Sequence, residues 1–119
     1  MAQSLLLISR QAPWSGPGAR EALDIALAGG AFDLPLSLLF LDDGVFQLRK
    51  DQQAVLLQQK DLAANLQALP LFGVEELYAC QRSLDERGLV ADQLGLPVSV
   101  LDDDALRVLL GRFDQVMTI

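Results

Sequence analysis

The stretch from Leu34 to Leu41 reads LPLSLLFL, and it is apolar at almost every position. A strand with one face in water alternates apolar and polar side chains, so this near-continuous run predicts a strand buried on both faces of a parallel sheet. Further apolar runs lie at about Ser4 to Ser9, Glu76 to Cys80, Pro97 to Leu101 and Gln115 to Ile119. The sequence therefore predicts a sheet of five strands.

Segments with a helical period separate these strands. From Gly18 to Ala28 small and apolar residues share one stripe, and we expect Gly29 and Gly30 to end this helix. Alternating strands and helices give a parallel sheet with right-handed crossovers and helices on both faces. With 119 residues, the chain is long enough for one core and too short for two. We therefore predict an α/β fold in a single domain, residues 1–119, with a five-stranded, mainly parallel sheet.

The segment between the second and third strands allows two interpretations. One long helix would have an apolar face formed by Val55, Leu62, Leu66 and Leu69. Alternatively, Asp61 caps a shorter helix that follows an exposed amphipathic segment from Asp51 to Lys60. The sequence leaves both interpretations open.

A short helix is expected directly after the third strand. Ser83 and Glu86 have capping-box spacing, so this helix should start just after Cys80 and stop at Gly88. A thiol at a helix N-terminus lies near the positive end of the helix dipole, which favours the reactive thiolate. A buried and inert cysteine is the alternative interpretation of Cys80.

The loop from Gln11 to Gly18 follows the first strand, at the end of the sheet where parallel α/β proteins carry their sites. It lacks the Lys-Ser/Thr pair of a phosphate-binding loop and the spaced glycines of a dinucleotide fingerprint. We interpret it as a stiff connection, with Trp14 as an interface or packing residue. A phosphate or nucleotide site at Gly16 to Gly18 is the competing hypothesis.

Two adjacent carboxylates, Asp42 and Asp43, follow the second strand. Such a pair can hold a divalent cation. However, the acidic pair of a phosphorylation receiver follows the first strand, and the third strand here ends in a cysteine rather than an aspartate. We favour a turn that points Val45 and Phe46 into an interface, and we expect no metal site and no cofactor.

A second acidic cluster, from Asp102 to Asp104, precedes the last predicted helix. Short polar side chains at this position satisfy the free N–H groups of a helix start. We therefore expect Asp102 or Asp103 to cap this helix and Gly111 to end it.

The charge and the cysteine content exclude several classes of protein. A net charge of −7, with nine scattered Lys and Arg residues, argues against direct binding of nucleic acid. No apolar run approaches the roughly 20 residues of a membrane span, and the apolar start at Met1 to Ile8 has no basic lead of a signal peptide. A lone cysteine, Cys80, fits a reducing compartment. We expect a cytoplasmic protein.

The apolar content points to partner chains. Counted with glycine and without tyrosine, it is about 58%, against roughly 45–50% in an average soluble domain. Either the core is unusually large or part of the surface is buried against other chains, and we favour the second explanation. Trp14, Val45, Phe46 and Phe72 are the predicted interface residues.

Two segments carry a resemblance to a known family. The residues from Asp42 to Leu48 read DDGVFQL, and those from Tyr78 to Leu89 read YACQRSLDERGL. Both resemble the DsrE/DsrF-like family, and most closely its C-type branch (TusC, DsrF). The predicted order of elements agrees with that family over essentially the whole chain.

The resemblance implies membership in a sulfur relay. Proteins of this family form a complex of related B-type, C-type and D-type subunits, arranged as a dimer of heterotrimers. The complex receives sulfur as a persulfide from a small donor protein and passes it to an acceptor protein. In the Tus branch the sulfur ends in 2-thiouridine at the tRNA wobble position, and in the Dsr branch a similar complex serves sulfur oxidation.

The role of Cys80 within such a relay is open to two hypotheses. The family's acceptor cysteine is associated with the D-type subunit, and Cys80 falls at the corresponding position between strand and helix. Asp85 and Glu86 add negative charge that opposes a thiolate. We therefore favour a non-catalytic, structural subunit, and the alternative is a sulfurtransferase subunit that carries a persulfide on Cys80.

Overall fold

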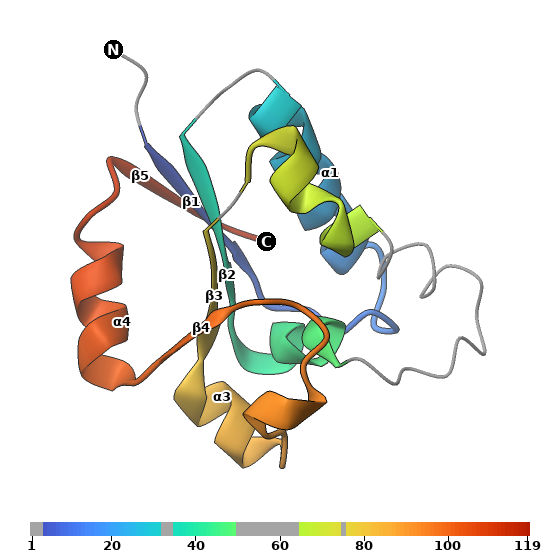
Figure 1. Cartoon of the computed structure of the whole chain (residues 1–119), viewed down its shortest axis with the longest axis vertical. Helices are drawn as coiled ribbons and strands as arrows, with labels where there is room; N and C mark the ends of the chain where they lie inside the picture. The colour runs from blue at the N-terminus through green and yellow to red at the C-terminus, as the bar shows by residue number, and fades with distance from the viewer. Residues whose placement is uncertain (1–3, 32–34, 50–64, 75) are drawn as a thin grey trace.

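The computed structural model describes residues 4–31, 35–49, 65–74 and 76–119 (Figure 1). Its strands are β1 (Leu5–Ser9), β2 (Leu36–Phe40), β3 (Leu77–Cys80), β4 (Ser99–Leu101) and β5 (Gln115–Thr118). They form one sheet in the order β4-β3-β2-β1-β5, and all neighbouring strands are parallel. The predicted five-stranded parallel sheet is confirmed.

Helices cover both faces of this sheet, as predicted. In the described part of the chain they are α1 (Gly18–Ala31), α3 (Gln81–Glu86) and α4 (Asp103–Leu110), with the 3-10 turns η1 (Asp42–Leu48), η2 (Leu69–Phe72) and η3 (Ala91–Gln93). Helix α1 and turn η2 pack on one face, and α4 packs on the other (Figure 1). None of the described helices is long and apolar enough to cross a membrane.

The burial of the strands explains their sequence patterns. Leu38 and Phe40 of β2 belong to the larger core cluster beneath α1, whereas Leu39 packs with Leu109 of α4 on the other face. All five residues of β2 are buried because both faces are covered, which accounts for the unbroken apolar run. Strand β5 lies at an edge of the sheet, and all four of its residues are exposed.

The prediction that Gly29 and Gly30 end the first helix is wrong. Helix α1 continues to Ala31, and both glycines are buried within it. A Cβ added at Gly30 would collide with the carbonyl oxygen of Phe72. The glycine is therefore needed for a close approach between α1 and η2, and it does not mark a helix end.

The short helix after the third strand has the predicted position, but its cap differs from the prediction. Helix α3 starts directly after Cys80, and Gly88 follows it with a φ of 68°. The capping-box interpretation is wrong, because Cys80 occupies the N-cap and Ser83 lies inside the helix. The Ser83 hydroxyl instead accepts a hydrogen bond of 2.8 Å from the backbone N–H of Asp42.

The last helix agrees with its predicted caps. Asp102 occupies the N-cap of α4, and its carboxylate accepts a hydrogen bond of 2.8 Å from the backbone N–H of Ala105. Gly111 is the C-cap residue.

The predicted apolar face between the second and third strands is described only in part. Leu66 and Leu69 are buried. Val55, Asp61, Leu62 and the segment from Asp51 to Lys60 lie outside the described residues. The choice between one helix and two therefore stays a prediction.

Candidate functional site

The turn η1 and the helix α3 lie together at the carboxyl ends of the strands. The first follows β2 and the second follows β3, and the two contact each other (Figure 1). This is the end of a parallel sheet where sites are usually found. The fold brings the predicted residues Asp42, Asp43 and Cys80 to the same end of the sheet.

Asp42 begins η1 in a left-handed conformation. Its φ is 52°, and among the described residues it is the only non-glycine residue with a positive φ. Aspartate tolerates this conformation better than most residues. Its backbone N–H donates to Ser83, and its carboxylate accepts a hydrogen bond of 2.7 Å from the Arg10 guanidinium. Asp42 thereby links the ends of β1 and β2 to α3.

The middle of η1 crosses the end of β1 at very close range. A Cβ at Gly44 would collide with the carbonyl oxygen of Ser9, so only glycine fits there. The buried Gln47 amide donates hydrogen bonds of 2.8 Å to the Ser9 hydroxyl and 2.8 Å to the carbonyl oxygen of Gln11. The distinctive DGVFQL segment therefore provides the contacts that hold η1 against β1.

Arginine and aspartate side chains form ion pairs on the surface at the carboxyl ends of the strands. Arg87 of the α3 C-cap contacts the Asp43 carboxylate at 2.9 Å and also donates to the Ser83 carbonyl oxygen at 3.2 Å. Arg82 pairs with Asp103 of α4. The carboxylates of these pairs are largely exposed, so each pair adds little stability by itself.

Cys80 is enclosed at this edge. It is the last residue of β3, it forms no disulfide, and only 4% of its surface is exposed. Its partner across the sheet is Leu101 of β4. A thiol with so little exposure cannot meet a bulky sulfur donor in this arrangement, because nucleophilic attack requires direct access to the sulfur.

The two carboxylates expected to oppose a thiolate are engaged in local contacts. Asp85 accepts a hydrogen bond of 2.8 Å from the Gln81 amide one turn earlier in α3. Glu86 lies 3.7 Å from the guanidinium of Arg87. Both contacts stay within α3 and its C-cap.

The predicted interface residues divide into three groups. Trp14 is 57% exposed, and its ring lies 5.1 Å from that of the partly buried Phe46, measured between centroids. Phe72 is 44% exposed. The prediction for Val45 is wrong, because this side chain is 0% exposed and belongs to the chain's own core. Trp14 and Phe72 keep surface available for a partner.

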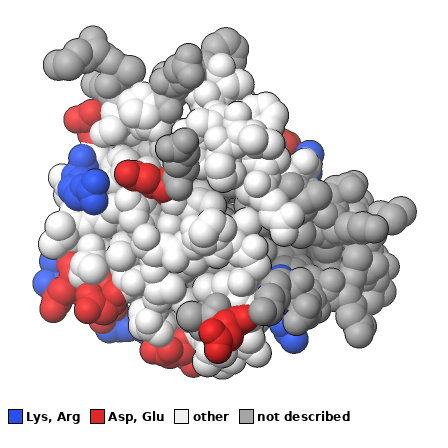
Figure 2. Space-filling view, in the orientation of Figure 1, with Lys and Arg blue, Asp and Glu red and all other residues white. Residues whose placement is uncertain are grey.

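The described side chains on the face in Figure 2 form no gathered basic region. On the face in Figure 2, the blue side chains are separated from one another and acidic side chains lie among them. Within the described residues, no group of three or more His, Cys, Asp or Glu side chains has the arrangement of a metal site. Asp42 and Asp43, the candidate cation ligands, pair with Arg10 and Arg87 instead.

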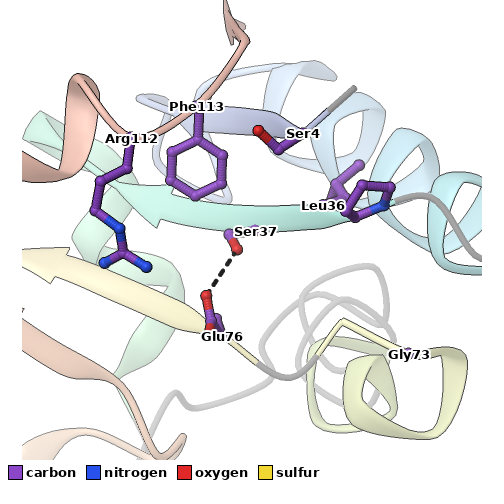
Figure 3. Close-up of a pocket in the computed structure, with 8 residues that line it drawn as sticks. Ser4, Leu36, Ser37, Gly73, Glu76, Arg112 and Phe113 are labelled. Carbon is purple, nitrogen blue, oxygen red and sulfur yellow. Dashed lines mark hydrogen bonds between the residues drawn. The ribbon is translucent and has the colours of Figure 1, made fainter. Parts of the chain in front are cut away.

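A pocket that the sequence did not indicate lies at the opposite end of the sheet. It has a volume of about 390 Å³, and it is lined by residues at or just before the starts of the strands, among them Ser4, Leu36, Ser37, Glu76, Arg112 and Phe113 (Figure 3). Glu76 accepts hydrogen bonds from the hydroxyls of Ser37 at 3.4 Å and Tyr78 at 3.0 Å. The pocket thus combines a carboxylate, a guanidinium and an apolar wall.

Tyr78 reports the electrostatics beside this pocket. Burial raises the pKa of its hydroxyl, and the hydrogen bond and negative charge of Glu76 raise it further. The guanidinium of Arg112 lowers the same pKa. The tyrosine hydroxyl therefore interacts with both the carboxylate of Glu76 and the guanidinium of Arg112.

Comparison with known proteins extends over the whole chain. A model of the DsrE/DsrF-like family matches residues 3–119. A Pseudomonas aeruginosa protein described as a TusC homolog is 70% identical over 119 residues, which is 100% of both chains. A Vibrio vulnificus protein with the same description is 36% identical over 114 residues, covering 96% of this chain and 97% of that protein.

Two solved structures of low sequence identity have the same architecture. The ychN protein of E. coli has a TM-score of 0.77 and 21% identity, and the match covers 98% of this chain and 99% of that one. A protein of unknown function from Methanobacterium thermoautotrophicum has a TM-score of 0.67 and 17% identity over the same shares of the two chains. At these identities the structures show a common fold.

Proposed function

The chain belongs to the DsrE/DsrF-like family, and on this premise we propose that it is the C-type subunit of a sulfur-relay complex, with a structural rather than a sulfur-carrying role. The observation that carries this proposal is the enclosure of Cys80, which is 4% exposed. A relay cysteine must reach the sulfur of a second protein. Cys80 cannot do so without a rearrangement of the edge that surrounds it.

The residues of the resemblance support the same role. Asp42, Gly44 and Gln47 serve contacts that hold η1 against β1 and α3. Each of these side chains, or the lack of one at Gly44, has a structural explanation. The segment that marks the family therefore builds a rigid edge on which Cys80 is fixed.

The proposed assembly is a heterohexamer of two B-type, two C-type and two D-type subunits in the cytoplasm. Small donor and acceptor proteins would bring persulfide sulfur to it and remove it, and the final product would be 2-thiouridine at the tRNA wobble position. The separated basic side chains on the face in Figure 2 and the net charge of −7 favour an indirect role in this RNA chemistry. A DsrF role in sulfur oxidation is the related alternative.

The test is co-expression of this chain with its B-type and D-type neighbours, as wild type and as Cys80→Ser. We expect a complex of unchanged mass and unchanged wobble-uridine thiolation for the variant. In the native complex near neutral pH, Cys80 should react with a thiol reagent much more slowly than in the unfolded chain. An intact complex with lost thiolation would instead identify Cys80 as a persulfide carrier.

A further inference from the structure

We propose that the pocket at the amino ends of the strands is the docking site for a neighbouring subunit, which inserts a carboxylate beside an apolar side chain. The inference rests on the proposed function, and it adds the surface and the chemistry of the contact. The pocket and its surroundings contain three features that point to such an occupant.

The first feature is an imbalance between the two charged side chains of the pocket. Glu76 already accepts hydrogen bonds from Ser37 and Tyr78. Arg112 lines the pocket and interacts with the hydroxyl of Tyr78, but it forms no ion pair among the described residues (Figure 3). A guanidinium has five N–H donors in a fork that fits a carboxylate. The group that completes the pocket is therefore an anion.

The second feature is the apolar wall beside this guanidinium. Leu36 and Phe113 line the pocket, and Figure 3 shows the Phe113 ring directed toward its interior. Gly73 lines the same pocket, and the two residues before it are among the most exposed apolar side chains of the described structure, with Leu71 at 87% and Phe72 at 44%. An arginine surrounded by apolar and aromatic side chains is the usual composition of an energetic centre in a protein interface.

The third feature concerns the size of the exposed region. A free carboxylate would satisfy Arg112 but would leave Leu71 and Phe72 in water. A protein surface that covers the apolar rim brings its carboxylate to Arg112 as part of the same contact. The occupant that fits both requirements is a partner chain.

The proposal is tested in the co-expressed complex with Arg112→Glu, which reverses the pocket charge. The readout is the amount of this chain retained per tagged D-type subunit, measured by quantitative mass spectrometry. We expect a loss of at least about tenfold, because two like charges would face each other in the contact. Arg20→Glu is the matched control and should leave retention unchanged. Arg20 is an exposed arginine of α1, and among the described residues its ion pair is with Asp24 of the same helix.

A second variant keeps the test independent of the folding of Arg112→Glu. Leu71→Asp changes a side chain that is 87% exposed and should also reduce retention about tenfold. Val90→Asp, in the segment after α3 at the other end of the sheet, is its control. Thermal unfolding of the isolated variants should match that of the wild type.

The possible outcomes separate this inference from the proposed function. Normal retention of both Arg112→Glu and Leu71→Asp would overturn the inference while the subunit role stands. If the wild-type chain assembles with neither B-type nor D-type subunits, the proposed function itself fails. If the variants abolish only self-association of the isolated chain, the occupant is a second copy and the inference is wrong.

Discussion

The two ends of the sheet use charged side chains in opposite ways. At the carboxyl end, arginines and aspartates from different segments pair with each other: Arg10 with Asp42, Arg82 with Asp103 and Arg87 with Asp43. At the amino end, Glu76 and Arg112 line one open pocket without forming an ion pair. Among the described residues, the end of the sheet that usually carries chemistry therefore has its charges paired, whereas the opposite end has a pocket.

The comparison teaches that the position of a residue in a fold does not determine its role. Cys80 lies where a relay cysteine is expected, but the contacts around it enclose it. The pocket lies at the amino ends of the strands, away from the usual place of a site in a parallel sheet, yet its Arg112 forms no ion pair among the described residues. The following predictions test two points. The first is whether the contacts at the carboxyl end contribute strongly to stability, and the second is whether the charges at the amino end act on Tyr78 as described.

The largest effect should come from Gly44→Ala at the closed end. The new methyl group would collide with the backbone of Ser9, which cannot move without disturbing β1. We expect a loss of about 3 kcal/mol in the free energy of unfolding, measured by denaturant titration. Gly111→Ala at the other end is the control, because its nearest neighbouring atom would be 3.6 Å away, and its effect should lie within about 0.5 kcal/mol. Equal losses of unfolding free energy in Gly44→Ala and Gly111→Ala would contradict the difference between the two ends of the sheet.

Gln47→Ala should have the next largest effect. The variant loses the amide that donates to Ser9 and Gln11, and it leaves the buried Ser9 hydroxyl without this donor. The expected loss of unfolding free energy is about 2 kcal/mol. Gln81→Ala removes an exposed amide hydrogen bond of the same length and should cost less than about 0.5 kcal/mol. If Gln47→Ala left the free energy of unfolding unchanged, η1 would be held mainly by packing.

Asp43→Asn should have a small effect although it breaks a clear ion pair with Arg87. The Asp43 side chain is mostly exposed, so water replaces much of the lost interaction. We expect a change of about 0.5 kcal/mol at moderate ionic strength, and less in high salt. A loss above about 2 kcal/mol would mean that the ion pairs, rather than Gly44 and Gln47, hold this edge.

Tyr78 gives the smallest effect on stability at neutral pH and a direct measure of the open end. It is the only tyrosine of the chain, so its phenolate absorbance can be followed without interference from others. Its pKa is raised, which means that folding favours the protonated hydroxyl; the associated stability is present below pH 10 and is lost as the pH rises through the folded pKa. Arg112→Gln should raise this pKa further and Glu76→Gln should lower it. Unchanged titration in both variants would separate Tyr78 from the pocket charges.

The strands could be predicted from the sequence because burial on both faces leaves a local trace. Runs such as Leu34 to Leu41 have no polar face, and this pattern requires no knowledge of distant partners. Asp102 was similarly predictable as a cap, because it bonds a residue only three positions away. Where structure depends on neighbours along the chain, the prediction succeeded.

The errors arose where contacts connect distant segments. Gly30 has the sequence context of a helix end, but its role is set by Phe72 on another element. Ser83 has capping-box spacing, but its hydroxyl bonds Asp42. Val45 was placed in an interface because the sequence does not show that η1 folds back onto the core. The pocket was missed for the same reason, since its residues come from the starts of four different strands and the segments before them.

The pairing of β5 with β1 has a consequence for the order of folding in time. The edge of β1 that faces away from β2 is filled only by β5, and the backbone N–H of Ser4 is held by the carboxylate of Asp114 at 2.8 Å. A ribosome makes β5 about a hundred residues after β1, so the sheet cannot close until that stretch of chain has been made. Closure must bring together segments of the greatest separation in the sequence, which is the slowest class of folding step. Until β5 is made, the edge of β1 that pairs with it is therefore open to pairing with other chains.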